Sequence, residues 1–153
     1  MAKNKMSFWA VFILVVTIIS TIMLAVGVIA FAVSIGPAQE LARQEAVKQG
    51  LSDADIQIAV AVVTTGLIGA FVASSILEVL QIIGGFLFSL KGRWGIFCII
   101  MAILSGGTNI FELINAISKG SGVFAIVTAS VAVVLSALMI VACFKHRAEN
   151  HHA

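Results

Sequence analysis

Residues 82–104 read IIGGFLFSLKGRWGIFCIIMAIL, two apolar runs joined by a short basic turn at 91–94. Each run belongs to a longer apolar stretch, and about 20 such residues are enough to cross a bilayer as a helix. The turn is too short to hold a domain between the two runs. The stretch therefore predicts two neighbouring membrane-spanning helices that run in opposite directions.

The whole chain has the same character. Of its 153 residues, 61% are hydrophobic and 10% are charged, whereas soluble domains average about 45–50% apolar and about 25% charged residues. Four long apolar stretches separate the charged segments, and each is long enough to span a bilayer. We predict an all-α polytopic membrane protein, a single domain over 1–153, with four transmembrane helices in an antiparallel bundle. The spans are expected near 8–35, 60–90, 94–118 and 121–144.

The basic residues predict the orientation. Six of them fall on one side of the predicted bundle, namely Lys3, Lys5, Lys91, Arg93, Lys145 and Arg147. The other three, Arg43, Lys48 and Lys119, fall on the opposite side. Because positive residues collect on the cytoplasmic side, both termini are expected in the cytoplasm, in a bacterial plasma membrane.

The first two spans are longer than a bilayer requires, and residues 36–59 between them also read as helix. Pro37 suits a first helical position, Gly50 suits the position after a helix end, and SDAD at 52–55 resembles a capping box. We therefore predict that the first two helices extend into an extracytoplasmic helical hairpin that turns near Gly50. A break at Gly66 or Gly69, with residues 56–65 lying on the membrane surface, is the alternative.

A carboxylate lies in the middle of the second span, in SILEVLQIIGG at 75–85. Glu78 is about 18 Å from the inner boundary at 1.5 Å per residue, and a charge near the midplane costs roughly 2.5–3.5 kcal/mol on insertion scales. Polar residues at helical spacing on spans 2 and 3 form a stripe that is expected to face inward, with Glu78 at the level of Gly106–Asn109. The candidate ligand- or ion-binding residues are Glu78, Glu112, Gln81, Asn109, Asn115 and Ser74.

Small residues form the second pattern. At helical spacing they allow two membrane helices to approach closely. The candidate packing residues are Gly84, Gly85, Gly106, Gly107, Gly122, Ala125 and Ala129. We expect Cys98 and Cys143 to be free apolar cysteines, and His146, His151 and His152 to lie on a solvated basic tail.

No catalytic motif, metal site or cofactor pattern occurs, so the sequence predicts neither an enzyme nor a nucleic-acid partner. The leading expectation is a protein that acts by association, as an accessory, regulatory or immunity-type subunit or as a homo-oligomer. Its partners would be membrane lipid and either a second copy or another membrane protein. Two alternatives stay open, a small transporter or channel that uses Glu78 and Glu112 as a proton or cation site, and a bundle that binds lipid or a hydrophobic ligand.

Overall fold

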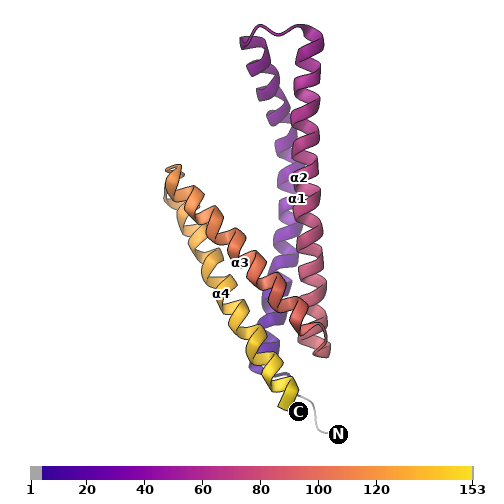
Figure 1. The fold of residues 1–153 in the computed structure, drawn as a ribbon, viewed down its shortest axis with the longest axis vertical. Helices are drawn as coiled ribbons and strands as arrows, with labels where there is room; N and C mark the ends of the chain where they lie inside the picture. Colours follow the sequence, from indigo (N-terminus) through magenta and orange to yellow (C-terminus); the bar gives the residue numbers. More distant parts are fainter. Residues whose placement is uncertain (1–4, 153) are drawn as a thin grey trace. The chain divides into compact units, whose positions relative to one another are not determined.

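The computed structural model describes residues 5–152, so Lys3, which contributes to the predicted orientation, lies outside the described residues. Four helices make up this part of the chain, α1 (Phe8–Lys48), α2 (Asp53–Lys91), α3 (Gly95–Ser118) and α4 (Gly122–His152) (Figure 1). Each contains a segment long and apolar enough to cross a membrane. The prediction of an all-α chain with four such helices is confirmed.

The turn between α1 and α2 follows the predicted local chemistry. Gly50 has φ 71°, a left-handed conformation that glycine adopts without steric cost. Its N–H donates to the carbonyl of Val47, and the N–H of Leu51 donates to that of Ala46, which is a Schellman helix end. Ser52 then caps α2, because its hydroxyl accepts the backbone N–H of Asp55 at 3.3 Å.

Two expectations about helix continuity are resolved. The helix α2 runs without interruption through Gly66 and Gly69, so the alternative break at these glycines is wrong. Pro37 lies inside α1 and not at the start of a separate outer helix. Proline lacks an N–H, so the carbonyl one turn earlier loses its usual donor, yet the helix continues because the surrounding residues favour it.

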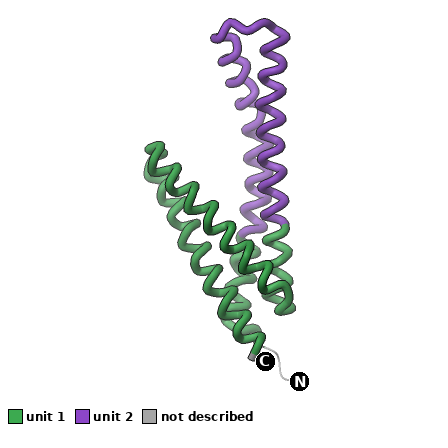
Figure 2. The backbone as a smooth tube through the Cα atoms, in the orientation of Figure 1, with its two compact units in different colours: residues 1–19, 80–153 green, residues 20–79 purple. Residues whose placement is uncertain are grey.

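The chain divides into two compact units, which Figure 2 distinguishes by colour. Unit 1 comprises residues 1–19 and 80–153, and unit 2 comprises residues 20–79. Both α1 and α2 therefore contribute to each unit, whereas α3 and α4 belong to unit 1 alone. The two units are described separately below.

Unit 1 contains a core to which all four helices contribute, and within it α3 packs against α4. Ile13, Phe88 and Cys143 are the largest fully buried side chains. The other buried members of the cluster are Cys98, Ile99, Ala102, Met139 and Ala142. This core lies near the turn where α2 ends and α3 begins.

Unit 2 is a pair of helices, formed by the second part of α1 and the first part of α2. Phe31 stacks on Phe71 with ring centroids 4.1 Å apart and an interplanar angle of 7°. Further along α1, the Gln39 amide donates to the Thr64 hydroxyl at 3.0 Å. Later residues of α1 thus contact earlier residues of α2, as expected for two helices joined by the turn at Gly50.

Candidate functional site

A polar groove lies between α1 and α2 in unit 2. It has a volume of about 350 Å³ and is open on one side. Seven residues line it, namely Gln39, Arg43, Gln57, Val60, Ala61, Thr64 and Thr65. We call it the Arg43 groove, after its one charged lining residue.

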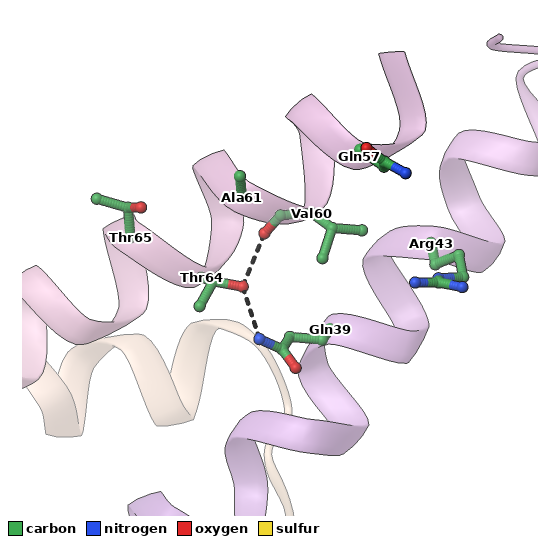
Figure 3. Close-up of a pocket in the computed structure, with 7 residues that line it drawn as sticks. All are labelled: Gln39, Arg43, Gln57, Val60, Ala61, Thr64 and Thr65. Carbon is green, nitrogen blue, oxygen red and sulfur yellow. Dashed lines mark hydrogen bonds between the residues drawn. The ribbon is translucent and has the colours of Figure 1, made fainter. Parts of the chain in front are cut away.

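The groove lies where the sequences of α1 and α2 change between apolar and polar residues. Towards the turn, α1 becomes polar from Gln39 onward, and α2 becomes apolar only after Gln57. In Figure 3, Arg43 and Gln57 extend into the space between the two ribbons, and the bond between Gln39 and Thr64 closes one end of it. The Thr64 hydroxyl also donates to the carbonyl of Val60 at 2.7 Å, which holds it in place.

No acidic side chain lines the groove. The nearby charges at this end of unit 2 interact with one another instead, since Lys48 lies 3.9 Å from Glu45 and Glu40 accepts a hydrogen bond from Gln44. Among residues 5–152, no carboxylate lies within ion-pair distance of Arg43. The lining of the groove therefore carries one positive charge, in a segment that also holds Glu40, Glu45, Asp53 and Asp55.

The predicted polar stripe is distributed over both units. Glu78 is exposed in unit 2, and no hydrogen bond or ion pair within residues 5–152 reaches its carboxylate. Ser74, also exposed, donates to the carbonyl of Phe71 in its own helix. Gln81 is half-buried and belongs to unit 1.

On α3, the stripe turns towards α4. Asn109 donates to the Ser136 hydroxyl at 2.6 Å and to the carbonyl of Ala132 at 3.4 Å. Asn115 is half-buried and Glu112 is exposed. Glu112 belongs to unit 1 and Glu78 to unit 2, so the predicted meeting of Glu78 with Gly106–Asn109 stays a prediction.

The candidate packing residues fall into two groups. Gly84, Gly85 and Gly106 are buried, and an added Cβ would contact Phe97 at Gly84, Thr17 at Gly85 and Ser136 at Gly106. Ala125 and Ala129 are half-buried. In contrast, Gly107 and Gly122 are exposed, and within the described chain nothing lies within 4 Å of a Cβ built on either.

His146 is a residue that the sequence interpretation missed. The expected solvated tail is wrong at this position, because α4 continues to His152 and His146 is 6% exposed. Its Nε2 lies 3.0 Å from the Phe88 carbonyl, and its Nδ1 lies 3.4 Å from the Ser7 hydroxyl and 3.7 Å from the Glu149 carboxylate. A carbonyl only accepts, so Nε2 carries the hydrogen of this bond.

His146 joins the ends of α1 and α2. The Phe88 carbonyl, in the final turn of α2, accepts the N–H of Gly92 at 3.0 Å and also lies 3.0 Å from Nε2 of His146, so both of its lone pairs are used. Ser7 caps the start of α1, since its hydroxyl accepts the N–H of Ala10 at 3.2 Å. A histidine one turn past the apolar part of α4 can contact both the Phe88 carbonyl and the Ser7 hydroxyl. Sequence periodicity alone does not reveal these contacts.

Cys98 and Cys143 are free and buried, as expected, but they are also neighbours. Their thiols are close enough to interact across the contact between α3 and α4. Within residues 5–152, no group of three or more His, Cys, Asp or Glu side chains is arranged to hold a metal ion. The pair is therefore a contact of the core, one residue from each helix.

Fold and sites together define a class, an all-α chain whose four long helices are apolar enough to cross a membrane. No model of a known family, no curated protein and no solved structure matches the chain. Function is therefore inferred from the residues of the chain alone.

Proposed function

We propose that the chain is an integral membrane protein with four antiparallel spans and both termini in the cytoplasm. The length and hydropathy of all four helices support insertion, and the excess of basic residues at one end supports the orientation. The uncharged part of α1 before Glu40 is about 50 Å long as a helix. At a tilt of about 30° it covers about 44 Å, the thickness of a bilayer with its headgroups. Residues 36–59 would then extend from the outer headgroups into the extracytoplasmic space.

The protein acts by association and not by catalysis, and Glu78 is the observation that carries this proposal. Its carboxylate is exposed in the apolar part of α2, without a partner in the described chain. It lies about 18 Å from the end of α2, too far for its side chain to reach the headgroups. Glu112 differs, because it lies only about 9 Å from the end of α3. A carboxyl that faces lipid near the midplane is unfavourable, so another polypeptide surface covers Glu78.

A second copy of the chain is the partner that we propose, because in a twofold contact the same α2 surface of both copies would cover both carboxyls at once. Elsewhere on α2, nothing lies within 4 Å of a Cβ built at Gly66 or Gly69, and exposed Val62 and Ile76 flank these glycines. Large and small residues side by side suit packing against another membrane helix. At about 100° per residue this surface lies on the opposite side of α2 from Glu78, so it is a second contact surface and not the one that covers the carboxyl.

Single-molecule photobleaching of labelled chains in liposomes tests the proposal. Wild-type protein is expected to form dimers that persist on dilution into excess lipid. Glu78→Leu removes the carboxyl. Since interhelical hydrogen bonds in membranes are each worth about 0.6–2 kcal/mol, loss of two symmetric bonds predicts dimers weaker by about eightfold or more. Glu78→Gln keeps hydrogen-bonding capacity and is expected to dimerise nearly as well as wild type.

Glu112→Leu is the matched control, the same change on an exposed carboxylate close to a helix end, and it is expected to leave dimerisation unchanged. A wild-type chain that stays monomeric at high density in the membrane would contradict self-association. Crosslinking in the native membrane then decides whether another membrane protein contacts Glu78, as an accessory or regulatory subunit would require.

A further inference from the structure

The Arg43 groove has the chemistry of an anion site. Arg43 brings five N–H donors in a planar fork, and Gln57 adds an amide from α2. The Gln39 amide is already engaged with Thr64. Figure 3 shows Gln57 extending towards α1, whereas Thr65 projects away from it. The Arg43 guanidinium and the Gln57 amide are therefore the donors beside the groove, whose lining holds no carboxylate.

Phosphate is the anion that this arrangement fits best. A guanidinium matches two phosphate oxygens with two parallel N–H···O bonds, and such charge-assisted bonds are roughly twice as strong as neutral ones. The volume of about 350 Å³ is enough for a phosphate ester but small for a ligand buried as a whole. The open side leaves room for the remainder of the ligand outside the groove.

The position of the groove favours a lipid as the source. Arg43 is the first basic residue after the uncharged part of α1, and Gln57 precedes the apolar part of α2. Charged residues that border an apolar stretch lie at the level of the lipid headgroups. Below the groove, α1 and α2 present exposed apolar side chains such as Val33 and Val72, against which acyl chains can pack.

We propose that the Arg43 groove binds a phosphate group, carried either by a phospholipid headgroup or by a free phosphate ester. Arg43 holds the phosphate oxygens and Gln57 supplies a further donor from the facing helix. The choice of a lipid source rests on the membrane insertion proposed above, whereas phosphate binding itself does not.

Two binding measurements on the full chain test this. In the first, the protein is purified in a maltoside detergent, mixed with phosphatidylglycerol, and retained lipid is counted by native mass spectrometry. In the second, inorganic phosphate or glycerol 3-phosphate is titrated, and the NMR signal of the Arg43 side chain is followed. Binding in the first measurement alone identifies a lipid, and binding in both with competition identifies the phosphate group as the shared ligand.

Arg43→Gln is expected to weaken phosphate binding about tenfold or more, and Arg43→Lys is expected to restore only part of it because the fork is lost. Lys48→Gln is the matched control, since it removes a positive charge from the same helix outside the groove. Far-UV circular dichroism verifies that each variant is helical. Glu78→Leu is expected to bind phosphate like wild type, so that failure of self-association and failure of this site can be told apart.

Equal binding by Arg43→Gln and wild type in both measurements would overturn the proposal. An equal loss in Arg43→Gln and Lys48→Gln would also overturn it, because it would show attraction to positive charge in general and not a site in the groove.

Discussion

Replacing Gly85 with alanine tests the tightest helix contact in unit 1. Gly85 is buried, and a Cβ added there would contact the Thr17 hydroxyl, with the Thr17 methyl carbon 3.1 Å away. Thr17 is 3% exposed, and its hydroxyl donates to the carbonyl of Ile13 at 2.7 Å. The threonine cannot rotate away without breaking this bond, so the added methyl group must push α1 and α2 apart.

Two effects of opposite sign set the magnitude. Gly→Ala inside a helix stabilises it by about 0.5–1 kcal/mol, and overpacking of a rigid contact costs about 1–3 kcal/mol. We expect Gly85→Ala to lower the free energy of unfolding by about 1–2 kcal/mol. Gly107→Ala is the matched control in the same unit, because nothing lies within 4 Å of its added Cβ, and it is expected to raise that free energy.

Unfolding by dodecyl sulfate in mixed micelles, followed by circular dichroism, measures both variants. The double variant Gly85→Ala/Thr17→Ala removes the hydroxyl and methyl group that the new Cβ would contact. It is expected to be more stable than the sum of the single variants predicts, by about 1 kcal/mol. Two results would refute the contact, namely Gly85→Ala being as stable as Gly107→Ala, or strict additivity in the double variant.

Three further predictions follow from single contacts. Diamide oxidation of the folded chain is expected to join Cys98 and Cys143 within one molecule, so that maleimide labels no thiol after denaturation. Labelling of both thiols would contradict their proximity. His146→Ala is expected to lower the free energy of unfolding by about 1–3 kcal/mol through loss of buried hydrogen bonds, whereas His151→Ala leaves it unchanged. An alanine at Gly50 must adopt φ 71°, and a melting temperature lower by several degrees is expected, corresponding to about 1–2 kcal/mol.

The helices and the turn at Gly50 could be predicted because both depend on local sequence. Long apolar stretches, a glycine at a helix end and the serine cap at Ser52 act over a few residues, and the structure contains each of them. The first helix was predicted to extend to the turn near Gly50, but Pro37 was expected at a first helical position, and it lies inside α1. A proline reads locally as a helix start, but a helix that is favourable on both sides can continue through it.

The contact partner of a polar side chain could not be predicted from local sequence. Asn109 was expected to meet the second span because the turn at 91–94 is short. The turn between α3 and α4 is equally short, and Asn109 donates to Ser136 on α4. A helix in a bundle has two neighbours, and helical periodicity says which residues share a face but not which neighbour that face contacts.

His146 and Glu78 both depart from what their local sequence predicts, His146 by being buried and Glu78 by being exposed without a partner in the described chain. His146 follows the apolar part of α4, in a segment that reads as solvated, yet it is buried because the ends of α1 and α2 supply its hydrogen-bond partners. Glu78 lies in a segment that reads as buried in lipid, and the described chain supplies it with none. Polar groups in an apolar environment need partners. The contacts of unit 1 supply partners for His146, and for Glu78 the same reasoning supports the proposal that another polypeptide surface covers it.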